Sequence, residues 1–261
     1  MNDPRDELAA LSAELRARLE REQERGRAHL TSSGLREALD RPRSAAGPAP
    51  APAPAPDRGK RLPLLDPEPE APDYGERMAR LAALASAAST CDKCRLCATR
   101  KQVVFGRGSA RNRVLFIGEA PGAEEDRLGE PFVGRAGKLL DQILDAVGFR
   151  REEIYIANIL KCRPPDNRDP RPDEIAACTP YLEEQIELVN PKILCALGRF
   201  AAGYLVDQLG APMGGLRGRV LSYRDRIPVV PTYHPAALLR NPDLKRIVWE
   251  DMQLLRREYL R

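Results

Sequence analysis

The chain has 261 residues and a formal net charge of +4, from 42 basic and 38 acidic side chains. This length suits one core with appended segments, and the balanced charge excludes a uniformly basic protein, so any nucleic-acid contact must come from a local basic surface. No apolar run approaches the ~18 residues of a membrane span, which excludes a transmembrane segment. The opening MNDPRDELAAL lacks the basic and apolar pattern of a secretory signal, and we therefore expect a cytoplasmic protein with reduced cysteines.

The segment before residue 74 is predicted to precede the folded domain. Residues 1–41 are a charged arm, disordered or helical, in which leucines recur on one face of a short amphipathic pattern. Residues 42–73 contain the run PAPAPAPAP, which predicts an extended linker with too little apolar content for a core. We expect the arm to act as a tether, and it is the part of the chain that could bind a further partner of unknown identity.

Residues 74–261 carry the pattern of a folded domain. A helix predicted over 78–89 leads into Cys91. Short apolar or β-branched runs then predict four strands, at 113–118, 153–159, 192–198 and 227–233. Helical patterns lie between the strands and after the last one, at 137–149, 172–190, 199–209 and 243–260. The alternation predicts an α/β fold with a central, mainly parallel four-stranded sheet and helices on both faces.

Polar residues stand at three of the predicted strand ends. Glu119-Ala120-Pro121-Gly122 follows the first strand, Asn158 lies near the end of the second, and His234 follows the fourth. In open α/β sheets ligands bind beyond the carboxyl ends of the strands. We therefore expect an acid, an amide and the histidine of the folded region to meet at one edge of the sheet.

Four of the six cysteines form a split pattern, with Cys91 and Cys94 as C-x2-C and Cys162 and Cys178 as C-x15-C. Four thiolates hold either tetrahedral zinc or an iron–sulfur cluster. The doublet and the basic residues around both pairs favour a metal site over unrelated core thiols. The spacing alone leaves the metal open.

The blocks GEAPGAEEDRLGEPFVGRAGKLL, NILKCRPPDNR and HPAALLRNP, together with the cysteine pattern, resemble the family 4 uracil-DNA glycosylases over about residues 88–260. These are the iron–sulfur members of the uracil-DNA glycosylase superfamily. The resemblance implies a three-layer α/β/α fold and a [4Fe-4S] cluster of structural role, held by Cys91, Cys94, Cys162 and Cys178. It leaves Cys97 as a runner-up ligand, and Cys195, inside an apolar strand, is expected to be a core thiol.

The resemblance also implies an activity, the hydrolysis of the N-glycosidic bond of uracil in DNA, which initiates base excision repair. The base must first be flipped out of the duplex. Asn158 would then accept from uracil N3–H and donate to O4, Phe132 would stack on the ring, and His234 would donate to the charge that develops on O2. Backbone N–H groups of the loop with Glu119, Ala120 and Pro121 would bind uracil oxygens.

Two positions depart from the family 1 pattern. Ala120 stands where that family carries its water-activating aspartate, so Glu119, Glu125 and Asn167 are unranked candidates to position the water. Gly122 stands where family 1 carries the aromatic residue that excludes thymine.

DNA contacts are expected from HPAALLRNP, with Leu238 as the wedge and Arg240 on a phosphate, and from arginines elsewhere. These arginines are Arg163 and Arg168 in the second block and Arg217 and Arg219 in a predicted loop.

The sequence thus predicts a monomeric, monofunctional glycosylase acting on uracil in double- or single-stranded DNA. A covalent uracil-binding relative is one alternative, although the stretch between Cys162 and Cys178 lacks the histidine that it would need. A non-catalytic iron–sulfur module that binds DNA and docks a partner through the arm is another, and zinc in place of the cluster would give a colourless protein.

Overall fold

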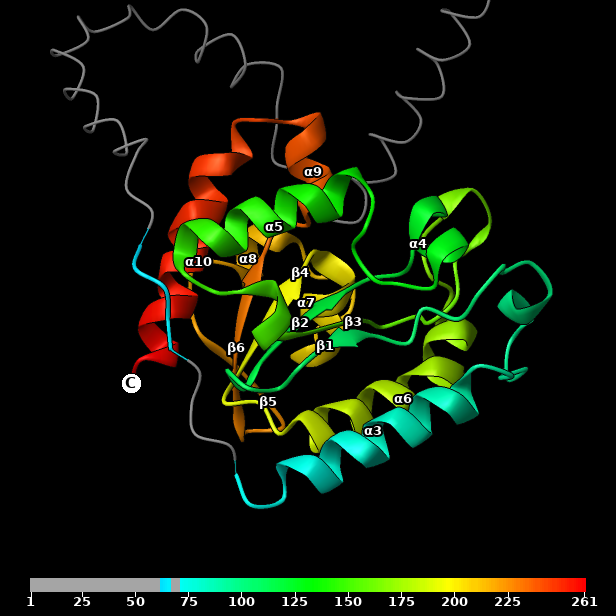
Figure 1. The fold of residues 1–261 in the computed structure, drawn as a ribbon. Coiled ribbons are helices and arrows are strands. Elements are labelled where there is room, and N and C mark those ends of the chain that lie inside the picture. The colour runs from blue at the N-terminus through cyan, green and yellow to red at the C-terminus, as the bar shows by residue number, and fades with distance from the viewer. Residues whose placement is uncertain (1–61, 67–70) are drawn as a thin grey trace, which may run out of the picture. The chain divides into compact units, whose positions relative to one another are not determined.

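The computed structural model describes residues 62–66 and 71–261 (Figure 1). The charged arm and most of the predicted linker lie outside the described residues. The described part is built on a six-stranded sheet in the order β1-β3-β2-β4-β6-β5. Its four central strands are parallel: β2 (Val114–Gly118), β3 (Tyr155–Asn158), β4 (Ile193–Leu197) and β6 (Ile227–Thr232).

The sheet has six strands instead of the four expected, because two short outer strands flank the four that the sequence predicts. β1 (Arg107–Gly108) pairs antiparallel with β3, and β5 (Leu221–Tyr223) pairs antiparallel with β6. β5 occupies part of the segment predicted as a loop. Its turn to β6 has positive φ at Arg224 and Asp225, with Arg226 N–H donating to Tyr223 O. Two-residue hairpin turns with positive φ usually contain Asn-Gly, and this turn does not.

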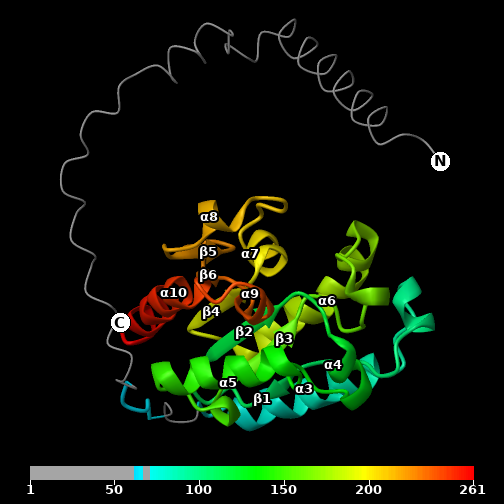
Figure 2. The ribbon, with the colours of Figure 1, turned by 90° about the horizontal axis from the view of Figure 1, so that it is seen from above.

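Helices cover both faces of the sheet and complete three layers, as expected (Figure 1). Side chains of β2 alternate between the faces, with Leu115 and Ile117 in one buried cluster and Val114 and Phe116 in the other. The first face carries the helices α3 (Tyr74–Ala88), α6 (Pro172–Val189), α7 (Arg199–Leu205) and α8 (Met213–Leu216). The second face carries α5 (Arg135–Val147), α9 (Pro235–Arg240) and α10 (Leu244–Tyr259), which contact one another (Figure 2).

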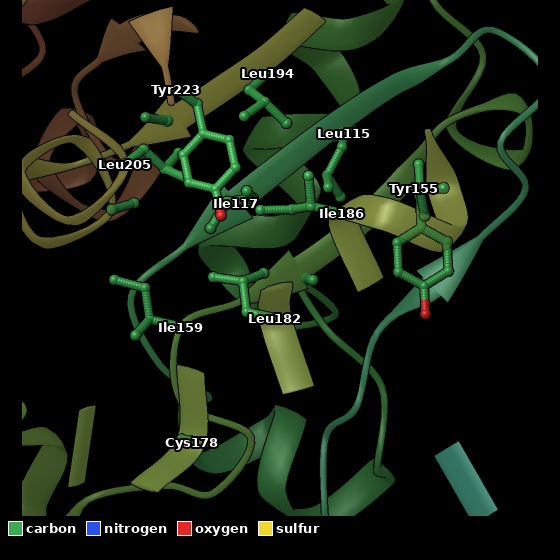
Figure 3. Close-up of a cluster of buried hydrophobic side chains, with 14 of the residues drawn as sticks. Leu115, Ile117, Tyr155, Ile159, Cys178, Leu182, Ile186, Leu194, Leu205 and Tyr223 are labelled. Carbon is green, nitrogen blue, oxygen red and sulfur yellow. The ribbon is translucent and has the colours of Figure 1, made fainter. Parts of the chain in front are cut away.

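α6 joins the core to the cysteines. Leu182 and Ile186 point from α6 toward Leu115 and Ile117 of β2, and Cys178 lies one turn before Leu182 on the same helix (Figure 3). The i, i+4 spacing places these residues on one helical face. The helix that closes the core therefore also carries one of the four cysteines.

Short elements connect the layers: α4 (Ala123–Leu128) and the 3₁₀ turns Arg95–Ala98, Arg151–Glu153 and Pro165–Asn167. The packed chain also begins ahead of Tyr74, where the domain was predicted to start. Leu62 and Leu65 donate backbone hydrogen bonds to Ala146 and Gly148 at the end of α5. Within the described residues, no helix combines the length and the apolar character needed to cross a membrane.

Candidate active site and cysteine cluster

The ends of β2 and β3 bring Asn158 and Phe132 together over Gly118. Gly118 is paired with Asn158 in the parallel register. A Cβ on Gly118 would lie 2.3 Å from Asn158 Oδ1 and 2.7 Å from Phe132 Cζ, so only glycine leaves room for both side chains. The Asn158 side chain is 1% exposed, and its Oδ1 has no hydrogen-bond partner within the described residues. A buried amide oxygen without a partner is costly, and a ligand with an N–H group would satisfy it.

Phe132 is held in a strained backbone conformation beside this amide. Its φ is 53°, a region that bulky residues rarely occupy and that recurs at functional sites. The loop is held by Glu125, whose Oε1 accepts from Val133 N–H at 2.9 Å and from Gly134 N–H at 2.8 Å. The Phe132 ring is 5% exposed and faces His234, with 5.4 Å between ring centroids.

His234 is presented by the start of α9, directly after β6. Its Nδ1 accepts from Ala236 N–H at 3.2 Å, so the neutral ring carries its proton on Nε2 and donates from there. Burial lowers the pKa of His234 to about 4; the charge of Arg240 also lowers it, and Glu125 opposes the shift. The imidazole is therefore a neutral hydrogen-bond donor at physiological pH.

Glu119 lies at the same edge of the sheet, and its carboxyl has a pKa shifted from the ordinary value. Burial and the nearby Asp169 raise the pKa of the Glu119 carboxyl to about 7, against the lowering effect of Arg199. Arg199 and Asp169 form an ion pair with each other. Beside Glu119, Ala120 is partly exposed and Pro121 is buried, and Pro121 has no N–H to offer to a ligand.

The other two candidates for positioning water are engaged within the protein. Glu125 binds the loop that carries Phe132, as described. Asn167 is exposed in a 3₁₀ turn, and its Oδ1 accepts from Arg163 Nε at 2.8 Å. The sequence did not separate these three residues, because the hydrogen bonds that engage Glu125 and Asn167 depend on the conformation of the loops and not on residue type or spacing.

The structure corrects one expected DNA contact in the HPAALLRNP block. The predicted wedge, Leu238, is 2% exposed and belongs to the core cluster under α5, α9 and α10. The next residue, Leu239, is 42% exposed, and Arg240 is exposed at the end of α9. The register of a six-residue helix decides which leucine faces outward, and the block alone does not reveal that register.

Two of the arginines expected to contact DNA are engaged by buried carboxylates of the protein. Arg168 Nη1 donates at 2.9 Å to the fully buried Glu174, to which Nη2 also donates. Arg217 makes two hydrogen bonds to the fully buried Asp251, at 3.0 and 2.7 Å. Both guanidinium groups neutralise buried carboxylates, a role that sequence cannot distinguish from phosphate binding. Arg163 and Arg219 lie nearer to solvent.

The four cysteines of the split pattern line one cavity. Cys91 follows α3, Cys94 precedes a 3₁₀ turn, Cys162 follows β3 and Cys178 lies on α6. Lys161 N–H donates to Cys178 Sγ at 3.2 Å, and Arg100 Nη1 donates to Cys162 Sγ at 3.5 Å. The lining of this cavity does not include Cys97 or Cys195, and Cys195 is fully buried in β4.

The four cysteines share the lining of this one cavity. Among the residues that the structure describes, no group of three or more His, Cys, Asp or Glu side chains is arranged to hold a single metal ion. Four thiols from separate segments around one cavity fit the donor set of an iron–sulfur cluster, which cysteine thiolates hold in fours.

The fold and this strand-end site define a class of protein. Residues 105–253 match the family model of the uracil DNA glycosylase superfamily, and the chain belongs to that superfamily. Within it, the sequence is 46% identical to the type-4 uracil-DNA glycosylase of Sulfurisphaera tokodaii, over 60% of this chain and 74% of that protein. It is 47% identical to the type-4 uracil-DNA glycosylase of Thermotoga maritima, over 59% of this chain and 81% of that protein. The expected resemblance to the type-4 group is thus confirmed.

Proposed function

We propose that this protein is a monofunctional uracil-DNA glycosylase, which flips uracil out of DNA and hydrolyses its N-glycosidic bond. The observation that carries the proposal is the buried Oδ1 of Asn158, which has no hydrogen-bond partner in the described part of the chain and lies near the Phe132 ring, which itself faces the neutral His234 imidazole. This arrangement offers a polar edge, a stacking face and a donor to one planar heterocycle.

Asn158 accounts for the choice of base. Its Oδ1 accepts from uracil N3–H, and its Nδ2 donates to O4. Cytosine carries an acceptor at N3 and a donor at C4, which would face like groups on the amide. A buried polar group left unpaired costs about 1–3 kcal/mol, and cytosine would leave two. Phe132 fixes the plane of the base by stacking on it.

His234 and Glu119 account for bond cleavage. When the bond to the sugar breaks, negative charge develops on the uracil, and the Nε2–H of His234 stabilises it at O2. A neutral donor aligned by Ala236 needs no proton transfer for this role. Water must then attack the sugar, and we assign its positioning to Glu119, because Glu125 Oε1 and Asn167 Oδ1 already accept hydrogen bonds from other groups of the protein.

Cys91, Cys94, Cys162 and Cys178 are the residues that would hold a [4Fe-4S] cluster. Such a cluster, when bound, supplies a rigid link between segments, and glycosidic hydrolysis transfers no electrons. Two of the four sulfurs already receive hydrogen bonds, from Lys161 N–H and from Arg100. Purified protein should absorb broadly near ~400 nm, as iron–sulfur proteins do, whereas a zinc-loaded protein would be colourless.

The DNA-facing surface lies at the same edge of the sheet. We transfer the wedge role from Leu238 to the exposed Leu239, with Arg240 and Arg163 on phosphates. The protein is proposed to act as a monomer in the cytoplasm, a reducing compartment that suits six cysteines of which none forms a disulfide.

The test is incubation of purified protein with a uracil-containing oligonucleotide, followed by alkali to cleave abasic sites. Wild type should give strand scission, and Asn158→Ala and His234→Ala should lower the rate by about 100-fold or more. The variant Arg226→Ala, at an exposed position directly before β6 and at the opposite end of that strand from His234, is the matched control and should cleave as wild type does. Binding without base release by wild type would overturn the proposal in favour of a non-catalytic DNA-binding module.

A further inference from the structure

A buried lysine lies between the recognition amide and the cysteine cavity. Lys161 is 2% exposed, three residues after Asn158 and directly before Cys162. Its Nζ donates to the backbone oxygen of Asn158 at 2.7 Å and to Gln185 Oε1 on α6. Burying an ammonium group is expensive unless it is well paired, so the position calls for a specific role.

The contacts of Gln185 fix the far side of this ammonium. Gln185 is fully buried, and its Nε2 donates to Phe105 O at 2.9 Å and to the Tyr155 hydroxyl at 3.4 Å. The Phe105 ring also lies under the ammonium, with its centroid 5.7 Å from Nζ. The ammonium therefore sits in a rigid socket made by α6, β3 and the segment before β1.

The Asn158 carbonyl lies where the sheet has no strand left to pair with it. Ile159 N–H donates to Gly118 O of β2, so by the alternation of strand groups the carbonyl of Asn158 faces the β1 side. β1 is two residues long and pairs with Tyr155 and Ile156. Lys161 supplies the partner for Asn158 O beyond the end of that short strand.

The backbone of Lys161 is itself held on two sides. Its N–H donates to Cys178 Sγ at 3.2 Å, and its carbonyl accepts from Val104 N–H at 2.8 Å. The side chain is thus not needed to place its own residue. Its reach back to Asn158 fixes the peptide from which the recognition amide projects.

We propose that Lys161 is a positioning residue for uracil recognition, which orients the Asn158 amide through the Asn158 carbonyl. The inference rests on the proposed function. Misplacing a recognition group by about 1 Å can cost ~100-fold in rate, so a fixed peptide at this point bears directly on catalysis.

The test uses the full chain with its cluster bound and the variant Lys161→Met, which keeps the length of the side chain and removes its donors. We expect kcat/KM for uracil release to fall at least about tenfold and inhibition by free uracil to weaken in parallel. Visible absorbance per protein should stay at the wild-type value. The matched control is Lys192→Met, which removes an aromatic-packed lysine at the start of β4, with its Nζ 5.2 Å from the Tyr259 ring centroid, and should leave kcat/KM unchanged.

A double-mutant cycle separates positioning from a general structural role. In an Asn158→Ala background, Lys161→Met should change the rate less than about twofold, because the amide it orients is gone. In a His234→Ala background, the full decrease should persist. Equal effects in both backgrounds, or an unchanged kcat/KM in folded, cluster-loaded Lys161→Met, would overturn the inference.

Two further outcomes are decisive. If Lys161→Met does not fold, Lys161→Gln replaces it, and failure of both to fold would assign Lys161 to the stability of the domain and overturn the positioning role. Absence of uracil release by wild type would overturn the proposed function itself, which distinguishes that failure from a failure of this inference.

Discussion

At the scale of single residues, the surroundings shift the pKa values of two groups of the site in opposite directions. Burial holds the pKa of His234 at about 4, and burial together with Asp169 raises the pKa of Glu119 to about 7. Both groups are desolvated, but desolvation disfavours the cation of one and the anion of the other. The result is a neutral donor and an acid that ionises near physiological pH at the same sheet edge.

The first prediction concerns the pH dependence of catalysis. If the Glu119 carboxylate positions water, kcat/KM should rise as pH increases through about 7, the pKa of Glu119, and His234 should contribute no change above about pH 5. The measurement is single-turnover excision from pH 5 to 9. Glu119→Gln should abolish the rising limb. If kcat/KM of Glu119→Gln still rose with pH at the same midpoint, the rise would belong to another titrating group.

The neighbours of Glu119 allow the sign of the shift to be checked. Arg199→Ala leaves the charge of Asp169 uncompensated and should move the limb to higher pH, whereas Asp169→Asn should move it to lower pH. The same displaced pKa bears on stability. Between pH 4.5 and about 7 the folded protein binds more protons at Glu119 than the unfolded chain does, so its contribution to stability falls as pH rises through that window.

The sequence predicted which residue types gather at the site better than it predicted their partners. Asn158 and His234 both follow from the rule that the carboxyl ends of parallel strands share one edge, and the Phe132 ring, from the loop before α5, lies beside both side chains. Leu238 and Arg168 did not behave as expected, because the burial of Leu238 and of Glu174, the partner of Arg168, depends on packing against segments that are distant in the chain. Arg168 and Glu174 are close in sequence, but nothing in the run between them indicates that Glu174 is fully buried.

At the scale of elements, the second prediction concerns the start of α6. Glu174 accepts from Arg171 N–H at 3.0 Å and from two nitrogens of Arg168, so one buried carboxylate both caps the helix and neutralises the guanidinium. Arg168→Ala would leave that charge buried without its partner. We expect the free energy of unfolding to fall by about 3 kcal/mol, measured by urea denaturation.

The control for this prediction is Arg163→Ala, which should leave the unfolding free energy within about 0.5 kcal/mol of wild type, since its side chain bonds the exposed Asn167. DNA affinity should respond in the opposite way, with a loss in Arg163→Ala and none in folded Arg168→Ala. An unaltered stability in Arg168→Ala would contradict the role of the pair.

The helices and strands with a long apolar run or a long hydrophobic period were predicted correctly. The helices over 172–190 and 243–260 correspond closely to α6 and α10, and the four apolar runs correspond to the four parallel strands. The edge strands β1 and β5, of two and three residues, are too short to carry a period. The β5–β6 turn has Asp225 but no glycine at its positive-φ positions, so it lacks the Asn-Gly or Asp-Gly pair that marks such turns in a sequence.

At the scale of the whole molecule, residues 62–66, which belong to the predicted linker, pack against the folded domain. Leu65 is 7% exposed in the core cluster of the second face, and Arg256 Nη1 donates to Pro63 O at 2.9 Å. Gly148, with φ 82°, is required here, because a Cβ would lie 2.2 Å from Pro63 O. This contact lies at the end of α5 remote from Phe132, about 18 Å along the helix.

The last prediction follows from the contrast between two adjacent leucines. Leu65→Ala should lower the free energy of unfolding by about 2–3 kcal/mol, because a buried leucine is truncated, whereas Leu64→Ala should have no measurable effect, because Leu64 is 55% exposed. Both variants should retain wild-type kcat/KM for uracil release, since the site lies at the other end of α5.

Truncations test the same attachment. Removal of residues 1–61 should leave the free energy of unfolding unchanged, while removal of residues 1–73 should lower it at least as much as Leu65→Ala does. Equal stability of the two truncations, measured by urea denaturation, would show that the attachment contributes nothing to the domain.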